Sequence, residues 1–244
     1  MSATQAPTPI SGYDDPALFS DDAIAHWVYR RGTGPVVVIM HELPGLTPKC
    51  IDLCNEIADE GFRVVVPLMF GAPQKFRLGR NFIGLCVNRE FHIFARRQTS
   101  PIVAWLRALC RQEMADQGGK PVGLIGMCLT GNFALGMVAD DAICAPVAAQ
   151  PSLPVAGPSA LAMNDEDLAA AKTRAKALGP GAILGFRYEK DALCKAAKFD
   201  RINAEFGDSF DSRTYPGRKH ATLTDHRVPE AFDATVAFLK EKLS

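Results

Sequence analysis

The residues with the clearest capacity for chemistry lie in the run 122–135, which reads VGLIGMCLTGNFAL. An apolar strand leads directly into a turn where Cys128 stands between the small residues Gly126 and Thr130, and a helix-like stretch follows. This arrangement is typical of a nucleophile elbow, with a thiol where serine is more common. The helix would direct its N–H groups and its positive dipole end at Cys128, which favours a reactive thiolate. The alternative is a buried and inert cysteine at a strand–helix junction.

A thiol nucleophile needs a base, and the base needs an acid that orients it. In this architecture the acid and then the base follow the nucleophile, each in a loop after a later strand. Two histidines follow the elbow, and His220 is favoured over His226 because it comes directly after a predicted strand and its loop. Asp191 follows the predicted strand 181–186, and Glu189 competes with it. The alternative role of either acid is a helix cap or a surface charge.

An oxyanion hole would need two backbone N–H groups beside the nucleophile. Leu129 supplies the first candidate because it directly follows Cys128. The loop after the predicted strand 35–40 supplies the second, at Leu43, because the next residue, Pro44, has no N–H.

Glu42 is unusual in its position at the end of an apolar strand. A carboxylate there must be paired, neutral or in contact with water. One interpretation is that it accepts a hydrogen bond from the Cys128 thiol or tunes its proton. The other is a structural glutamate in a salt bridge, with His41 or Arg218 as partner.

Strands and helices alternate along the chain, which predicts a mainly parallel sheet. The predicted strands are 25–29, 35–40, 62–67, the elbow strand, 142–149, 181–186 and 209–215. The predicted helices are 51–59, 102–114, the stretch after the elbow, 165–178, 196–206 and 229–243. Continuous β-branched runs indicate strands covered on both faces. We therefore predict an α/β fold with a doubly wound sheet and helices on both faces, a three-layer sandwich. It would form one domain over 23–244, after a flexible segment 1–22.

Length and charge narrow the possible partners. The chain has 244 residues and a formal net charge of zero, so the totals favour neither nucleic acid nor a membrane surface as partner. It has no apolar run of the roughly 20 residues that span a bilayer and no apolar signal core at its start. Seven cysteines without a CxxC pair favour neither a disulfide framework nor a zinc ribbon. We expect a cytoplasmic monomer or homodimer that acts on a small molecule.

Four segments together resemble the dienelactone hydrolase (carboxymethylenebutenolidase) family of the α/β-hydrolase superfamily. They are HELPGL at 41–46, GMCLTG at 126–131, the loop that carries Asp191, and YPGRKH at 215–220. The resemblance extends from about Trp27 to the C-terminus.

The resemblance implies an α/β-hydrolase fold and a Cys-His-Asp triad at Cys128, His220 and Asp191. It implies that Glu42 contacts the resting thiol until substrate displaces it, and that Leu43 and Leu129 are the oxyanion donors. It implies neither a metal nor an organic cofactor. The function that follows is hydrolysis of small esters or lactones through an acyl-enzyme.

Departures from the family pattern bear on the substrate. Known members carry an arginine four residues after the catalytic histidine, where it binds the substrate carboxylate; here that residue is Thr224, and Ala221 replaces a serine. The segment 75–97 holds six basic residues and one acid, and Arg89 is the candidate for binding a carboxylate. The alternative for this segment is a solvated surface. Hydrolysis of an ester or lactone is therefore the prediction, with dienelactone itself left open.

Two other interpretations compete with the hydrolase. Glutamine amidotransferases also use a Gly-x-Cys-x-Gly elbow, but they place an acid two residues after the histidine, where this chain has Thr222. A hydrolase fold can also be kept for binding alone, because the fold does not dictate function. The complete set of nucleophile, base and acid favours catalysis over both.

Overall fold

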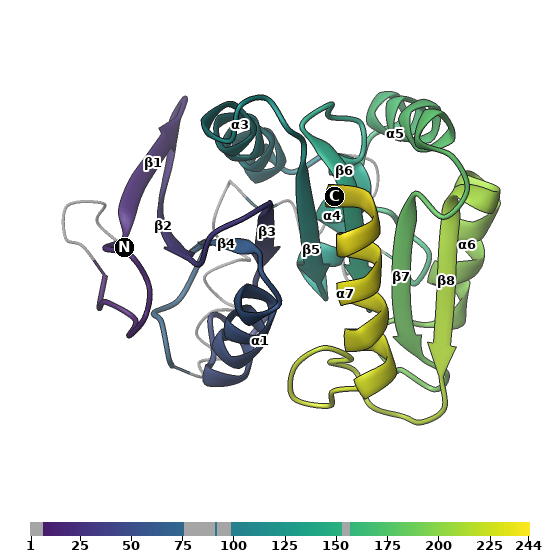
Figure 1. The fold of residues 1–244 in the computed structure, drawn as a ribbon. Coiled ribbons are helices and arrows are strands. Elements are labelled where there is room, and N and C mark those ends of the chain that lie inside the picture. Colours follow the sequence, from purple (N-terminus) through teal and green to yellow (C-terminus); the bar gives the residue numbers. More distant parts are fainter. Residues whose placement is uncertain (1–6, 76–90, 92–98, 153–156) are drawn as a thin grey trace.

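A computed structural model describes residues 7–75, 91, 99–152 and 157–244. Its centre is an eight-stranded sheet in the order β1-β2-β4-β3-β5-β6-β7-β8 (Figure 1). The strands are β1 (Ala17–Asp21), β2 (Ile24–Arg31), β3 (Val36–Met40), β4 (Arg63–Pro67), β5 (Val122–Met127), β6 (Ile143–Ala149), β7 (Ile183–Tyr188) and β8 (Phe210–Tyr215). The β1–β2 and β2–β4 pairs are antiparallel, and the other neighbouring pairs are parallel. This mostly parallel sheet confirms the predicted α/β-hydrolase fold.

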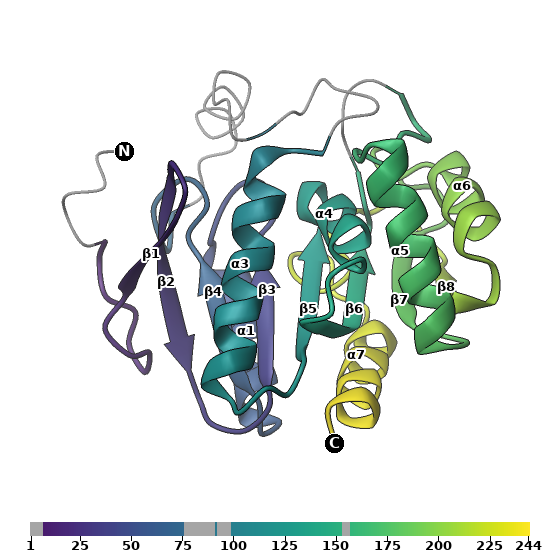
Figure 2. The ribbon, with the colours of Figure 1, turned by 90° about the horizontal axis from the view of Figure 1, so that it is seen from above.

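Helices cover both faces of the sheet, as Figures 1 and 2 show from two directions. Helices α1 (Pro48–Asp59) and α7 (Pro229–Leu243) pack on one face. The other face is covered by α3 (Pro101–Asp116), α4 (Leu129–Met137), α5 (Asp165–Leu178) and α6 (Ala196–Phe206). The three-layer arrangement is therefore confirmed.

The uninterrupted apolar sequence of β3 follows from its position in the sheet. Its side chains alternate between the two faces, as in any strand. Val37 and Ile39 pack into the core beneath α1 and α7, whereas Val38 and Met40 pack beneath α3 and α4. Because both sides are covered, every residue of the strand is buried.

Strand β1 lies within the range 1–22, for which we expected a flexible segment. It pairs with β2 along its whole length, and Ala17 lies opposite Val28. Further upstream, Ile10 is buried in the core, and the Tyr29 hydroxyl donates to the carbonyl of Thr8 at 2.8 Å. The sequence of β1, ALFSD, has an apolar run of only three residues, and most of its side chains are exposed, as is common in an edge strand.

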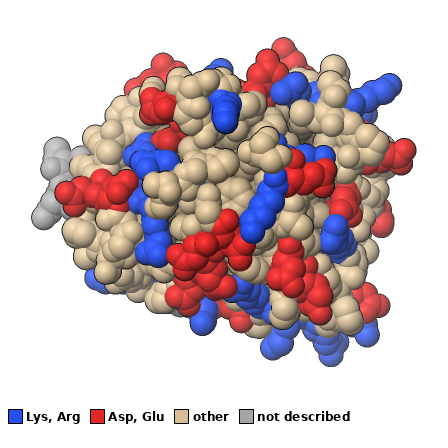
Figure 3. All heavy atoms as spheres, in the orientation of Figure 1, with Lys and Arg blue, Asp and Glu red and all other residues tan. Residues whose placement is uncertain are grey.

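The surface carries charges of both signs. On the face drawn in Figure 3, Lys and Arg side chains lie intermingled with Asp and Glu side chains. In the part of the chain that the structure describes, no helix has the length and apolar character needed to cross a membrane.

Candidate active site

Cys128 occupies a tight turn between β5 and α4. Its φ of 58° and ψ of −119° lie in a region that side chains other than glycine rarely adopt. Backbone hydrogen bonds hold the turn: the Cys128 N–H donates to the carbonyl of Ala149 at 3.0 Å. The Cys128 carbonyl accepts from the N–H groups of Gly131 at 3.1 Å and Ser152 at 3.0 Å. The turn presents the thiol at the carboxyl end of β5, as the elbow pattern predicts.

Gly126 allows the helix to approach the strand before this turn. A Cβ atom at Gly126 would lie 2.3 Å from the carbonyl oxygen of Thr130 and 2.9 Å from the Cβ of Ala134. We expect Gly126→Ala to lower the free energy of unfolding by about 3 kcal/mol, because backbone must move to relieve the clash. Gly136→Ala, in α4, is the matched control, since its nearest neighbour, Met163, lies 3.9 Å away. Urea unfolding of both variants tests this, and equal midpoints would contradict it.

His220 and Asp191 meet at the same edge of the sheet, after β8 and β7. The Nδ1 atom of His220 lies 2.7 Å from Oδ2 of Asp191. The other carboxylate oxygen, Oδ1, accepts from the N–H groups of Leu193 at 2.8 Å and Cys194 at 3.0 Å. Burial alone would raise the pKa of Asp191, but these hydrogen bonds and the charge of His220 hold it below its usual value. The carboxylate is thus ionised and fixed against one ring nitrogen.

The opposite nitrogen of His220, Nε2, faces the thiol. A ring nitrogen of His220 and the Cys128 sulfur lie within 4.8 Å of each other, and Nε2 lies 3.4 Å from the Ser152 hydroxyl that donates to this sulfur. Burial alone would lower the pKa of His220, but hydrogen bonds to Asp191 and Cys128 and the charges of both groups raise it to about 10. This environment favours the imidazolium form of the ring.

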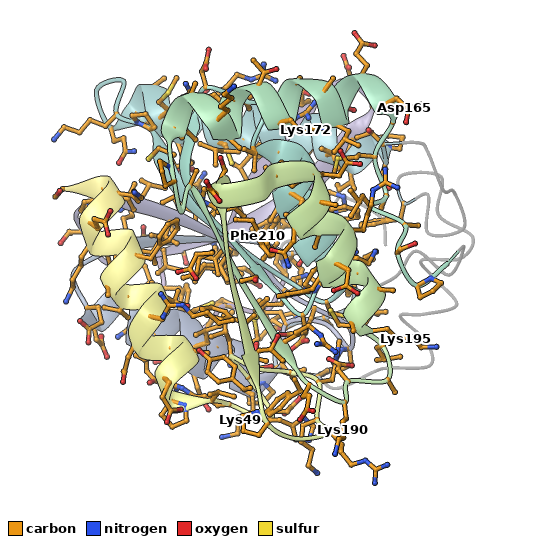
Figure 4. The ribbon with its side chains drawn as sticks, turned by 90° about the vertical axis from the view of Figure 1, so that its right-hand side faces the viewer. Lys49, Asp165, Lys172, Lys190, Lys195 and Phe210 are labelled. Carbon is orange, nitrogen blue, oxygen red and sulfur yellow. The ribbon has the colours of Figure 1, made fainter. Side chains whose placement is uncertain are left out.

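The predicted alternatives for base and acid are placed differently. Glu189 and His226 are both exposed. Asp191, in contrast, is buried. It lies in the segment after β7, between Lys190 and Lys195, which are labelled in Figure 4. The structure therefore brings His220 and Asp191, and not their competitors, to the cysteine.

Ser152 is a member of this cluster that the sequence analysis missed. Its hydroxyl donates to the Cys128 sulfur at 3.0 Å and lies 3.4 Å from Nε2 of His220. The residue is fully buried in the loop after β6. The one feature of the sequence that could have identified Ser152 is its position in a loop that directly follows a predicted strand.

Two further buried side chains, those of Asn132 and Lys198, connect to the Ser152 backbone through hydrogen bonds. The Asn132 amide, in α4, donates to the Ser152 carbonyl at 2.9 Å. Lys198, in α6, donates through Nζ to the Asn132 side-chain oxygen at 3.1 Å and to the carbonyl of Ala160. Burial lowers the pKa of Lys198 to about 8. The sequence feature that could have identified Lys198 as buried is its helical spacing, because it lies on the same buried face of α6 as Ile202 and Phe206.

Glu42 lies in the same cluster, and its carboxylate, the Cys128 sulfur and His220 are within 4.8 Å of one another. One oxygen accepts from the Thr224 hydroxyl, and the other accepts from the Gln150 amide at 3.3 Å. Burial raises the pKa of Glu42 above its usual value, although these two hydrogen bonds and the charge of His220 oppose the shift. Glu42 is thus held by neutral hydrogen-bond donors.

His41, one of the predicted partners of Glu42, has a structural role instead. Its Nε2 accepts from the backbone N–H of Met69 at 3.1 Å, and Nδ1 lies 3.4 Å from the Glu42 carbonyl. Complete burial lowers the pKa of His41 to about 4, so the ring is neutral at pH 7. It ties the start of the Glu42 loop to the chain after β4.

The remaining predicted residues are the two oxyanion donors and the carboxylate-binding arginine. Leu129 is the first residue of α4, where a backbone N–H has no partner within its own helix, and Leu43 directly follows Glu42. Arg89, the predicted carboxylate-binding residue, lies outside the described residues.

Comparisons with known proteins identify the family of this chain. The Dienelactone hydrolase family, as a sequence model, matches residues 24–240. A search of curated proteins gives no match. Among solved structures, an esterase from Pyrococcus furiosus is 14% identical, with a TM-score of 0.67, over 95% of this chain and 93% of that one. A dienelactone hydrolase-like promiscuous phosphotriesterase from metagenomic libraries is 17% identical, with a TM-score of 0.63, over 94% and 98%.

A cold-adapted esterase from an Arctic intertidal metagenomic library is similar over the full length of both chains, with 16% identity and a TM-score of 0.66. At these identities the structures establish the fold, whereas the family match covers most of the chain and rests on its sequence. The assignment favours a hydrolase over a glutamine amidotransferase. The chain belongs to the dienelactone hydrolase family and is an ester or lactone hydrolase with the α/β-hydrolase fold.

Proposed function

We propose that the protein hydrolyses small esters or lactones by nucleophilic catalysis, with Cys128 as nucleophile, His220 as base and Asp191 as the acid that orients it. The observation that carries this proposal is the position of His220. One ring nitrogen is bound to a buried carboxylate at 2.7 Å, and the other faces the thiol at the nucleophile elbow. A protein that only binds its ligand has no need for this alignment.

In the first half of the reaction, the Cys128 thiolate attacks the carbonyl carbon of the substrate. The carbonyl oxygen becomes an oxyanion, which the N–H groups of Leu43 and Leu129 would stabilise. When the tetrahedral intermediate collapses, the carbon–oxygen bond to the alcohol breaks, and His220 donates its proton to the departing oxygen. The product is a thioester on Cys128; with a lactone, the alcohol remains attached to the acyl group.

In the second half, His220 removes a proton from water, and the resulting hydroxide attacks the thioester carbonyl. The carbon–sulfur bond breaks and releases the carboxylic acid. The thiolate and the imidazolium are restored, so no external oxidant, reductant or metal is needed for the atoms to balance.

Ser152 is proposed as a positioning residue for this pair. Its hydroxyl can donate to the thiolate while its oxygen accepts from the imidazolium N–H, so it bridges the two charged groups. We expect Ser152→Ala to slow iodoacetamide alkylation of Cys128 and to lower kcat by about 10-fold, the loss of one hydrogen bond to a charged group. Ser209→Ala, also buried but in the turn before β8, is the control. Equal alkylation rates in both variants would show that Ser152 only fills space.

Glu42 is proposed to tune the proton of Cys128. We expect Glu42→Gln to shift the pH dependence of Cys128 alkylation towards lower pH, because it removes a group that can place a second negative charge beside the thiolate. The neutral amide can keep hydrogen bonds to Thr224 and Gln150, so the fold should be retained. Alkylation rates from pH 5 to 9 give the readout. Superimposable curves for the variant and the wild type would assign Glu42 a purely structural role.

The substrate class follows from the same cluster. Thr224 occupies the position where known members have their carboxylate-binding arginine, and its hydroxyl is bonded to Glu42. We propose that the substrates are esters or lactones that need no carboxylate contact at this position. A panel of p-nitrophenyl esters, simple lactones and dienelactone would rank them.

The cellular location and the oligomeric state are part of the same proposal. The six cysteines that the structure describes are free thiols, which suits a reducing cytoplasm. We propose a monomer or homodimer there, with a small-molecule substrate as the principal partner.

A further inference from the structure

We propose that Glu42, Cys128 and His220 also form a binding site for one Zn²⁺ ion, and that zinc blocks the hydrolase reversibly. Each residue offers one ligand atom, a carboxylate oxygen, Sγ and a ring nitrogen, and these atoms all lie within 4.8 Å of one another. Thiolate, imidazole and carboxylate are the three side-chain ligands that zinc takes in proteins. Among the described residues, this is the one group of three such side chains with this spacing.

The groups around the three ligands already hold them in the required orientation. Asp191 binds Nδ1 of His220, which leaves Nε2 directed at the site. A carboxylate that accepts a hydrogen bond from the outer ring nitrogen is the usual partner of a zinc-binding histidine. Thr224 and Gln150 hold the two Glu42 oxygens, and a carboxylate oxygen keeps a further lone pair for a metal.

The spacing requires only small side-chain movements. With a zinc–sulfur distance of about 2.3 Å and zinc–nitrogen and zinc–oxygen distances of about 2.1 Å, tetrahedral ligand atoms lie roughly 3.4–3.6 Å apart. The present separations, at most 4.8 Å, would have to close by about 1.4 Å at most. Three protein ligands leave the fourth position for water. The soft thiolate and the imidazole select against Mg²⁺ and Ca²⁺, which prefer oxygen ligands.

Zinc binding would remove the nucleophile from the reaction. The Cys128 thiol loses its proton to the buffer when the sulfur–zinc bond forms, and Nε2 of His220 and Glu42 lose any proton they carry. The sulfur lone pair is then committed to the metal and the base has no free nitrogen. Chelation by EDTA returns both groups to their resting state. The site depends only on these three side chains, so it does not require the proposed catalytic roles to be correct.

Isothermal titration calorimetry of the purified 244-residue protein with ZnCl₂ tests the site. We expect one ion per chain, at least a 10-fold weaker affinity in Cys128→Ser and in His220→Gln, and about 10-fold weaker in Glu42→Gln. Cys144→Ser and His226→Gln are the matched controls, with a thiol and an imidazole outside the cluster, and should bind as the wild type does. MgCl₂ should give no binding. Wild-type affinity in the three cluster variants would overturn the proposal.

A second measurement needs no variant and so does not depend on folding of the substituted chains. Saturating Zn²⁺ should slow alkylation of Cys128 in the wild type at least 10-fold, measured by peptide mass spectrometry, and leave alkylation of Cys144 unchanged. An unchanged rate at Cys128 would overturn the proposal. Zinc binding in a protein that hydrolyses no ester would reject the proposed function alone, and hydrolysis without zinc binding would reject the zinc site alone.

Discussion

Replacing Cys128 by alanine is expected to abolish ester hydrolysis while the protein stays folded. The expected loss in kcat/KM is about 10³-fold or more, because the variant has no nucleophile for an acyl-enzyme. Folding should survive because backbone hydrogen bonds to Ala149, Gly131 and Ser152 hold the turn, and alanine keeps all of them. A p-nitrophenyl ester assay together with circular dichroism measures both effects. Retention of more than a tenth of the wild-type kcat/KM would reject Cys128 as the nucleophile.

Cys128→Ser tests the same residue with less change in shape. A hydroxyl has a far higher pKa than a thiol, so serine depends fully on general-base help. We expect activity well below the wild type, because the serine hydroxyl must give its proton to His220 before it can attack, whereas a thiolate needs no such step. Wild-type activity in this variant would mean that the site does not work through a thiolate.

Removal of the base or its orienting acid is the second large effect. We expect His220→Ala and Asp191→Ala each to lower kcat by about 10²- to 10⁴-fold, because one moves the proton and the other fixes the ring that carries it. The matched controls are His226→Ala and Glu189→Ala, whose side chains are exposed. Both controls should stay within a few-fold of the wild type. A reversed ranking within either pair would relocate that member of the triad.

The double variant gives an independent check on the same assignment. Residues that act as a unit show strongly non-additive losses. Cys128→Ala combined with His220→Ala should therefore be about as inactive as Cys128→Ala alone. A loss equal to the product of the two single losses would show that the residues act separately, and the triad would be wrong even if each residue matters.

The sequence was sufficient to predict the helices and to propose the residues of the triad in chain order. The helices at 165–178, 196–206 and 229–243 have the predicted bounds, because amphipathic spacing and local stop signals define them. Cys128, Asp191 and His220 could be proposed because in this fold the functional groups follow the carboxyl ends of parallel strands, and those ends meet at one edge of the sheet.

The contacts around the triad could not be read from the chain. Glu42 is bonded to Gln150 and Thr224, which lie 108 and 182 residues away in sequence, and no local pattern joins residues so distant. Ser152 reaches the thiol because of the path of the loop after β6. Strand β1 was missed for a different reason, since an edge strand needs no apolar alternation to pair with its neighbour.

The most direct test of the central claim is to trap the acyl-enzyme. The wild-type protein is mixed with excess p-nitrophenyl ester, quenched with acid within the first turnover, digested, and the peptides are weighed by mass spectrometry. The proposed mechanism predicts a burst of p-nitrophenol of about one equivalent and an acyl adduct on the peptide that carries Cys128. Turnover with no adduct on Cys128, or with the acyl group on another residue such as Ser152, would contradict it.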